Sequence, residues 1–451
     1  MKNMFGHIVR DYGMLFVLLL LCAVFSVATI RTVHPTGAAA GRQVAQDILD
    51  SFPANVKVMI ATRGNDEDVA FAEALDQTLK EANVTVVARV SGQSFDIVPV
   101  LEKLNSASQT LDVIACTQQT LANSRFLSEL GKRFENLKSS RVLTQRSYYE
   151  STFFSADNLL NNVIPSAAIY AIIAIGMTMV IITGGIDLSV GSLIALSAVV
   201  AGIILRDVFG GFSAGIAGMT AACLAAIAVG GLLGLFSGSI VTAFGITPFV
   251  VTLAMMSMAR GLAFILSNNT SINEIPATFK QFSIGRPLGV PNLVVIMVVL
   301  YIMAHIIMTR TVLGRYVYAV GGNREAARLS GVPVKRVLLF VYALCGALAG
   351  LGGALEAAKL SSASPLYGRE YELFVIAAVV VGGTSLMGGE GKILNSLIGA
   401  LIIAVIQKGL NLLGVDSNRQ LVVMGALIVG AVLIDNMKKR GFFNLARLRR
   451  R

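Results

Sequence analysis

Apolar and polar positions divide the chain into long apolar runs separated by short polar segments. A run of about 18 or more apolar residues is long enough to cross a bilayer as an α-helix. Such runs lie at residues 13–30, 161–183, 188–205, 213–236, 248–267, 290–308, 337–356, 373–388, 393–413 and 420–436. We therefore expect an all-α polytopic membrane protein with about ten transmembrane helices, two of which are short.

One long segment after the first apolar run has a different pattern. Short β-branched stretches at 56–61, 84–90 and 111–115 alternate with helix-like stretches at 66–83 and 97–107. Strands that alternate with helices predict a small parallel sheet. The expected domains are an anchor helix with its flanks at 1–41, an α/β insertion at 42–150, a transmembrane domain at 151–437 and a basic tail at 438–451.

Composition supports the membrane assignment. Hydrophobic residues make up 55% of the chain and charged residues 14%, and the mean hydropathy is +0.72. These values exceed what soluble globular domains normally show. The chain is therefore not expected to be a soluble enzyme.

The net charge of +11 does not indicate nucleic-acid binding, because the basic residues flank the apolar runs. Lys2 and Arg10 precede the first run, and the segment at 309–337 and the tail at 438–451 are rich in Lys and Arg. Positively charged loops stay in the cytoplasm. An even number of crossings then places both termini and segment 309–337 in the cytoplasm, and the α/β insertion outside it.

The first apolar run could also be a cleaved signal peptide. Arg31 and Pro35 follow it, and no small-residue cleavage motif is evident, so an uncleaved anchor is the preferred interpretation. Cys116 is the only cysteine of the α/β segment, which excludes a disulfide within that segment.

The three histidines give no support for a metal or a catalytic site. His7, His34 and His305 are far apart, with no carboxylate or cysteine at ligand spacing. No metal ligand set is expected on this chain.

A pair of glycines and a lone carboxylate interrupt the apolar sequence at Gly184, Gly185 and Asp187. Unpaired backbone inside a membrane survives only where it faces protein or a watery cavity. The break therefore indicates a pathway or gate. For Asp187 we prefer the role of N-cap of the following helix, and direct substrate contact is the alternative.

A second glycine-rich segment begins with Gly382 and Gly383 and ends at Gly391. Transporters often carry interrupted helices at paired positions of two halves, so a gating role is plausible here as well. The segment is not a phosphate-binding loop, because Lys392 is followed by Ile393 where Ser or Thr is required. Energy from ATP would have to come from another protein.

Several motifs together resemble one known family. They are GMTMVIITGGIDLSVGS at residues 176–192, GITPFVVTL at 245–253, AVGGN at 319–323, AARLSG at 326–331 and VGGTSLMGGEG at 381–391. This chain resembles, over residues 153–440, the permease subunits of sugar-importing ABC transporters, the group that includes ribose, xylose, arabinose and galactose permeases. The α/β insertion departs from the compact outer loops of that family.

The resemblance implies a set of partners and a location. They are two ABC ATPase subunits, a periplasmic binding protein that delivers a monosaccharide or related polyol, and a second permease chain, with a homodimer expected in a bacterial inner membrane. ATP and Mg²⁺ would bind the ATPase, and no cofactor is expected on this chain.

The resemblance also implies a coupling segment that docks on the ATPase. Its residues would be Gly321, Gly322, Asn323, Arg324, Ala326, Ala327, Arg328 and Gly331. Ala326, Ala327 and Gly331 would offer a small docking face beside Arg324 and Arg328. The alternative is a basic loop that only follows the charge rule for cytoplasmic segments.

Candidates for the translocation pathway or its gate combine the two glycine breaks with nearby polar and aromatic residues. They are Thr178, Thr183, Gly184, Gly185, Asp187, Ser189, Phe244, Thr247, Gly382 and Gly383. The glycine stripes Gly230/Gly234/Gly238 and Gly346/Gly350 are typical of close helix packing. Pro248 is expected to begin a helix.

Two other functions remain open. An ion-coupled secondary transporter would carry several embedded ionisable groups, and a ligand-sensing membrane protein would use the α/β insertion as its receptor. For the insertion itself, docking or sensing and a purely structural role are about equally supported. The charged residues Glu356, Lys359, Arg369, Glu370 and Glu372 are expected to form salt bridges at an outer rim.

Overall fold

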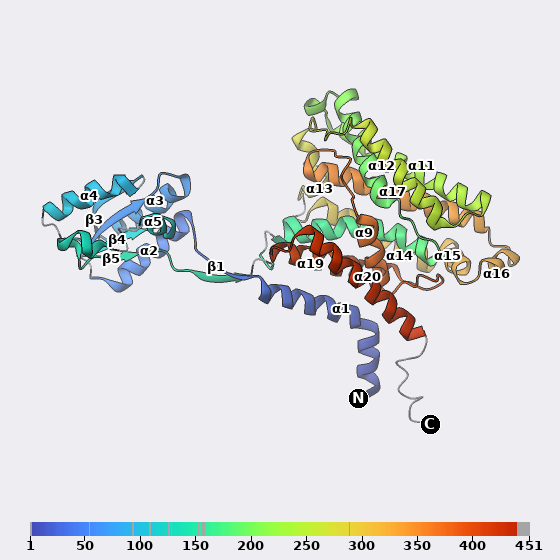
Figure 1. Cartoon of the computed structure of the whole chain (residues 1–451), viewed down its shortest axis with the longest axis horizontal. Coiled ribbons are helices and arrows are strands. Elements are labelled where there is room, and N and C mark those ends of the chain that lie inside the picture. The colour runs from blue at the N-terminus through green and yellow to red at the C-terminus, as the bar shows by residue number, and fades with distance from the viewer. Residues whose placement is uncertain are drawn as a thin grey trace. The chain divides into compact units, whose positions relative to one another are not determined.

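The computed structural model describes residues 2–53, 55–92, 94–107, 110–124, 127, 129–151, 153–155, 158–287 and 289–439. Most of the basic tail predicted at 438–451 lies outside the described residues. The chain forms two compact units (Figure 1). Residues Ile30–Ser151 make an α/β unit, and the chain up to Thr29 joins the chain after Ser151 in a helical unit.

The α/β unit is built on a four-stranded parallel sheet with the order β3-β2-β4-β5. The strands are β2 (Lys57–Thr62), β3 (Thr85–Ser91), β4 (Val113–Cys116) and β5 (Arg141–Leu143). An antiparallel pair, β1 (Ile30–Val33) with β6 (Tyr148–Ser151), brings the two ends of the unit together. The predicted stretches at 56–61, 84–90 and 111–115 correspond to β2, β3 and β4.

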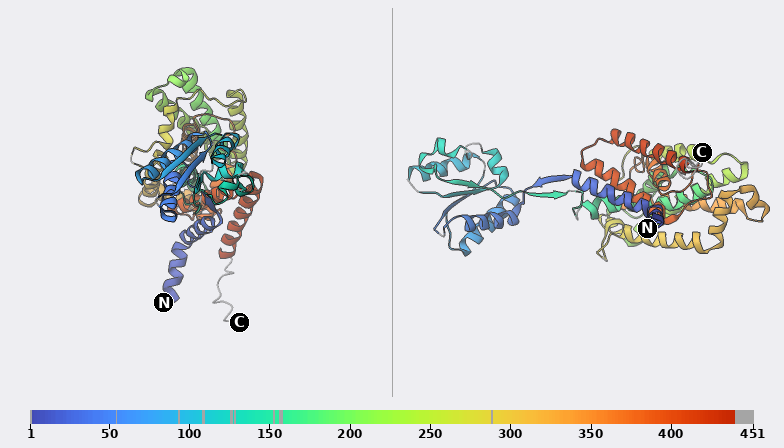
Figure 2. Two further views of the ribbon diagram at one scale, coloured as in Figure 1. Left: turned by 90° about the vertical axis from the view of Figure 1, so that its left-hand side faces the viewer. Right: turned by 90° about the horizontal axis from the view of Figure 1, so that it is seen from below.

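Helices cover both faces of this sheet (Figure 2, right). On one face α2 (Gly37–Ser51) and α3 (Asp66–Glu81) pack on Val58 and Ile60. On the other face α4 (Ser94–Ser106) packs on Met59 and Ala61. Because alternate residues of β2 face opposite cores, the strand reads as a continuous apolar run. The short helices α5 (Gln118–Asn123), α7 (Leu130–Arg133) and η1 (Glu135–Leu137) complete the unit.

Helix α2 was not expected, because its start was assigned to the flank of the anchor helix. Its first turns contain alanine and glycine, which carry a weak apolar signal. A side chain at Gly41 would collide with the backbone of Phe71 in α3. The small residues that hide the helix in the sequence therefore serve its close contact with α3.

The helical unit contains seven helices, among the described residues, that are long and apolar enough to span a membrane. They are α9 (Ile164–Ile182), α10 (Val190–Ile203, continued to Val208 by η3, Ile204–Val208), α11 (Ile216–Phe244), α12 (Pro248–Leu266), α14 (Asn292–Arg310), α17 (Val334–Leu360) and α19 (Ile393–Leu412). They coincide with seven of the predicted spans. The prediction of a polytopic membrane protein is confirmed.

The other three predicted spans differ in length or composition from these seven. Helix α1 (Lys2–Ala28) has a shorter apolar part, Gly13–Ala28, and α20 (Ser417–Lys439) has polar ends. The span predicted at 373–388 is wrong beyond residue 381, because α18 (Tyr371–Val381) stops there. Gly383 adopts a left-handed conformation, φ +81, and ends the helix.

Remaining short helices connect the long ones. The chain enters α9 through η2 (Leu159–Val163), and η4 (Gly211–Ser213) leads into α11. Segments η5 (Ala277–Lys280) and α13 (Gln281–Ile284) precede α14, and α15 (Val312–Gly322) and α16 (Arg324–Leu329) lie between α14 and α17.

Helices α11 and α17 make a close contact through the predicted glycine stripes. A side chain at Gly230 would meet Gly346 and Gly350, and one at Gly234 would meet the backbone of Tyr342. Figure 1 shows these helices side by side. The prediction that the glycines serve packing is confirmed, and Pro248 stands in the first turn of α12 as expected.

Candidate gate and coupling region

The first glycine break separates α9 from α10. Thr183 ends α9, with its hydroxyl donating to the carbonyl of Val180 at 2.8 Å. Gly184 then takes φ +75, which favours glycine. The next helix begins only after Ser189, so a short non-helical segment lies between two buried helices.

Asp187 organises this segment. It is fully buried, and its Oδ1 accepts hydrogen bonds from the Ser189 backbone N–H at 2.9 Å and from the Ser189 hydroxyl at 2.6 Å. The expectation that Asp187 is the N-cap is wrong, since Ser189 holds that position. Asp187 stands two residues earlier, where its carboxylate closes the turn that leads into α10.

The second glycine break contacts the first. After α18 ends, Gly382 and Gly383 begin a turn in which the Gly389 N–H donates to the carbonyl of Ile182 at 2.8 Å. The hydroxyl of Tyr318 in α15 donates to the carbonyl of Gly391 at 2.7 Å. A backbone hydrogen bond therefore joins the end of α9 to the turn after α18, and a side-chain hydrogen bond joins the same turn to α15.

The predicted coupling segment completes this contact. A side chain at Gly321 would collide with the carbonyl of Ile182 and would lie 2.7 Å from the Gly389 nitrogen. A side chain at Gly388 would lie 3.0 Å from both the Gly321 and the Ile182 carbonyl oxygens. We call the meeting of residues 182–185, 321 and 388–391 the glycine junction. Its backbones touch because Gly321, Gly388 and Gly389 have no side chains.

A cavity of about 250 Å³ adjoins the glycine junction. Four stretches of the chain contribute to its lining, which consists of Thr183, Gly184, Gly185, Pro248, Val320, Gly321, Gly322, Asn323, Arg324, Leu338 and Tyr342. The hydroxyl of Tyr342 is buried and has no hydrogen-bond partner among the described residues. The cavity thus joins residues predicted for the gate to residues predicted for coupling.

Three predicted pathway residues lie elsewhere. Thr178 is buried between α9 and α19, where its hydroxyl pairs with that of Ser396 at 2.6 Å. Phe244 and Thr247 are exposed and do not line the cavity. Thr247 instead precedes the first residue of α12.

The coupling segment is two short helices joined at Asn323. The Asn323 side chain caps α16 by accepting the Ala326 N–H at 2.9 Å. Arg328 pairs with Glu325 at 2.9 Å on the exposed side, a contact that contributes little to stability.

The small docking face predicted on α16 is wrong for one residue. Ala327 is only 5% exposed, whereas Ala326 and Gly331 are exposed. Consecutive residues of a helix point in different directions, so the two alanines cannot share one face. The exposed residues of this segment include Arg324, Ala326, Arg328, Leu329 and Gly331, and Leu329 is 77% exposed.

The chain between α17 and α18 is non-helical, and a partly buried arginine holds it. Arg260 of α12 donates from Nη1 to the carbonyls of Pro365 and Tyr367, each at 2.8 Å. The sequence interpretation passed over Arg260, although a single arginine inside an apolar run is itself a sign of a functional or structural site.

The first turns of α10 and α18 meet. A side chain at Gly191 would collide with the carbonyl of Gly368 and with the carboxylate of Glu372. Glu372 stands in the first turn of α18, and its Oε2 has no hydrogen-bond partner among the described residues. Two helix N-termini, each with a partial positive charge, therefore converge beside a carboxylate.

Charged residues predicted at an outer rim divide into two groups. Arg369 is exposed and forms a salt bridge with Glu370 at 3.8 Å, as expected for charged residues at a surface. Glu356 is only 6% exposed and pairs with Lys359 at 3.8 Å.

Tyrosines extend the polar group around Glu356. The Tyr170 hydroxyl donates to Gln407 Oε1 at 2.6 Å, and the rings of Tyr170 and Tyr371 lie 4.8 Å apart. These contacts connect α9, α18 and α19 by polar side chains that are largely withdrawn from solvent.

Interrupted helices that converge inside an apolar bundle are typical of transport permeases. A family model described as "Branched-chain amino acid transport system / permease component" matches residues 159–432. The chain belongs to this permease family, and the prediction of an ABC importer permease, a transport subunit, is confirmed.

Curated relatives agree with this assignment. The Ribose import permease protein RbsC of Escherichia coli (strain K12) is 47% identical over 330 residues, which cover 72% of this chain and 100% of the relative. RbsC of Bacillus subtilis (strain 168) is 43% identical over 295 residues, or 65% of this chain and 88% of the relative. The D-allose transport system permease protein AlsC of E. coli K12 is 36% identical over 285 residues, or 63% and 85%. No solved structure matches the chain.

Family membership selects among the open functions. An importer permease needs neither ion coupling nor a sensing role, so the two alternatives have no support from the relatives. The α/β unit lies outside the residues that the family model matches.

Proposed function

We infer that this chain is the permease of an ATP-driven importer for a monosaccharide or a related polyol. Relatives named for ribose and allose support a sugar as the substrate. Two copies of the chain would pair in a bacterial inner membrane. Two ATPase subunits, which bind ATP and Mg²⁺, would supply the energy, and a periplasmic binding protein would deliver the sugar.

In the proposed orientation both termini and α16 face the cytoplasm, and the α/β unit faces the outside. Helices α1 and α20 then add two crossings to the seven long helices. The non-helical chain at 361–370 and α18 together make one more, with α18 supplying the inner part. This arrangement gives ten crossings and places the glycine junction on the side where basic segments cluster.

The observation that carries the proposed mechanism is the glycine junction. Gly321 lies in the coupling segment and touches the end of α9 at Ile182 and the turn after α18 at Gly389. Backbone-to-backbone contacts of this kind leave no flexible side chain to absorb a displacement. A movement that the ATPase imposes on α16 would therefore reach both helix breaks together.

The gate would lie where the breaks and the helix N-termini meet. Ser189, Ser192 and the first turns of α10 and α18 offer hydroxyls and N–H groups, which suit a neutral sugar. Gly184, Gly185, Gly382 and Gly383 would allow the adjoining helices to rearrange.

The test is ATP hydrolysis by the chain, co-purified with its ATPase in nanodiscs, across a series of sugar-loaded binding proteins. Stimulation by one loaded binding protein is expected. Failure of any ATPase to associate would refute the importer mechanism.

A matched pair of variants tests the docking surface. Arg324→Glu should abolish ATPase association, because it reverses a charge on the exposed coupling segment. Arg419→Glu should leave association intact, since Arg419 is an exposed arginine at the opposite end of the proposed bundle. Equal ATPase association by the two variants would contradict docking at Arg324.

A further inference from the structure

The strand order of the α/β unit creates a crevice. From β2 the chain passes through α3 to β3 on one side, whereas β4 lies on the other side of β2 and is followed by β5. The connections after β2 and β4 thus leave the sheet in opposite directions. In open parallel sheets, ligands bind at this position, outside the carboxyl ends of the strands.

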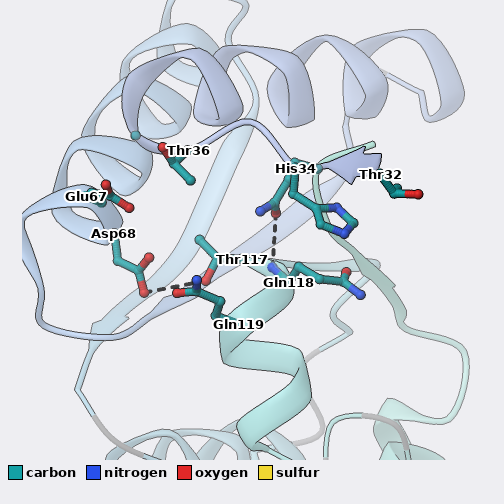
Figure 3. A pocket seen from close by; sticks show the side chains of 10 residues that line it. Thr32, His34, Thr36, Glu67, Asp68, Thr117, Gln118 and Gln119 are labelled. Atoms are coloured by element: carbon teal, nitrogen blue, oxygen red, sulfur yellow. Dashed lines mark hydrogen bonds between the residues drawn. The ribbon is translucent and has the colours of Figure 1, made fainter. Parts of the chain in front are cut away.

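A cavity of about 300 Å³ lies at this position. Figure 3 shows side chains that line it from distant parts of the unit, including Thr117, Gln118 and Gln119 after β4, Glu67 and Asp68 in the first turn of α3, and His34 before α2. Its volume is at the small end of ligand pockets. It suits a molecule the size of one sugar.

The wall of the cavity is held in place by hydrogen bonds. Asp68 is 4% exposed, and its Oδ2 accepts from the backbone N–H and from Nε of Arg63, each at 3.1 Å. The Thr117 hydroxyl lies 3.4 Å from the same oxygen. The Gln118 N–H donates to Gln145 Oε1 at 3.0 Å. Such fixed partners preorganise a binding site.

Two groups at the cavity remain open to a ligand. Nδ1 of His34 is enclosed and has no hydrogen-bond partner among the described residues. Thr36 is the N-cap of α2, yet its side chain makes no capping hydrogen bond. The first N–H groups of α2 have no partner within the helix, so this end offers donors toward the cavity.

The charges around the cavity select the class of ligand. Glu67 and Asp68 are acidic, and Arg63 is already engaged by Asp68 and Gln119. An anion would meet two carboxylates in a cavity whose described lining includes no Lys or Arg, whereas hydroxyl groups can donate to carboxylates and carboxamides and accept from N–H groups. The chemistry favours a neutral polyhydroxylated molecule.

We propose that the α/β unit binds a small neutral sugar or polyol at the crevice between β2 and β4, and so gives this permease a receptor site of its own. The site does not depend on ATP or on a separate binding protein. An experiment that refutes this sugar site is therefore distinguishable from one that refutes the transport function proposed above. Because the cavity is at the small end of ligand pockets and offers few contacts, binding should be weak.

The test is calorimetric titration of the full chain in nanodiscs, without ATPase or binding protein, with D-ribose, D-allose, D-fructose and myo-inositol. At least one of them should bind, and ribose 5-phosphate should not. The variant Glu67→Ala/Gln119→Ala removes an acceptor and a carboxamide from the cavity and should weaken binding at least tenfold.

The matched control is Gln77→Ala/Glu81→Ala, which removes the same residue types from the exposed outer part of α3, away from the cavity. It should bind like the unaltered chain. A second variant, Thr36→Trp, should block the cavity without removing a hydrogen bond. Absence of binding by all four compounds, equal binding by cavity and control variants, or tighter binding of the phosphorylated sugar would each overturn the proposal.

Discussion

Replacement of Gly321 by alanine tests whether the glycine junction transmits movement. The new methyl group would collide with the carbonyl of Ile182 and lie 2.7 Å from the Gly389 nitrogen. It would enter the hydrogen bond between these two groups, which measures 2.8 Å. Since both neighbours are backbone, neither can turn aside as a side chain would.

The magnitude follows from these contacts. Overpacking of this kind costs about 1–3 kcal/mol, and loss of the backbone hydrogen bond adds about 1 kcal/mol. The variant should therefore melt at a lower temperature. In proteoliposomes with the ATPase and binding protein, it should hydrolyse ATP with a lower yield of transported sugar per ATP.

Gly322→Ala is the matched control. It makes the same change one residue later in α15, where a side chain would meet nothing within 4 Å. Any gain in helix propensity from alanine is common to both variants. A normal ratio of sugar to ATP in Gly321→Ala, or an equal defect in Gly322→Ala, would refute transmission through the junction.

Three further changes probe single groups. Asp187→Asn keeps an oxygen acceptor for Ser189 and should preserve the melting temperature, whereas Asp187→Ala should lower the free energy of unfolding by about 1–3 kcal/mol. An equal loss of stability in both variants would mean that the charge itself is required. Arg260→Gln should free the chain at Pro365, which would be detected as faster labelling of a cysteine introduced there. Arg260→Lys should retain part of the protection. Unchanged labelling would contradict the idea that Arg260 holds this chain in place. Burial and the nearby Asp68 carboxylate raise the pKa of Cys116 to about 12, so at pH 8 only about one thiol in ten thousand is ionised. Maleimide should therefore label Cys116 only after the chain unfolds, which mass spectrometry would detect. Rapid labelling of the folded chain would contradict this prediction.

Periodicity alone predicted most of the helices and the central strands, because each depends on apolar residues within one segment. Which residues of a short helix are buried was harder to predict. Ala326 and Ala327 look alike in the sequence, and only the packing of α16 shows that Ala327 is buried. Helix α2 was missed because alanine and glycine at its start carry little apolar signal.

Contacts between distant segments could not be predicted. The sequence shows glycines at 184, 321 and 389, but nothing in their spacing says that their backbones touch. Arg260 is different, since its place inside an apolar run was visible from the outset. The charge of Arg260 inside an apolar run could have identified it from the sequence, whereas only the structure shows that it binds the carbonyls of Pro365 and Tyr367.

The pairing of β1 with β6 has a consequence for how such a chain can arise. Ile30 lies opposite Ser151, and Val33 lies opposite Tyr148, so the polypeptide enters and leaves the α/β unit at neighbouring points. Removing residues 34–147 would leave two paired strands that a two-residue turn could close. A gene could thus gain or lose the whole unit in a single recombination event, because the two ends of the inserted chain lie side by side.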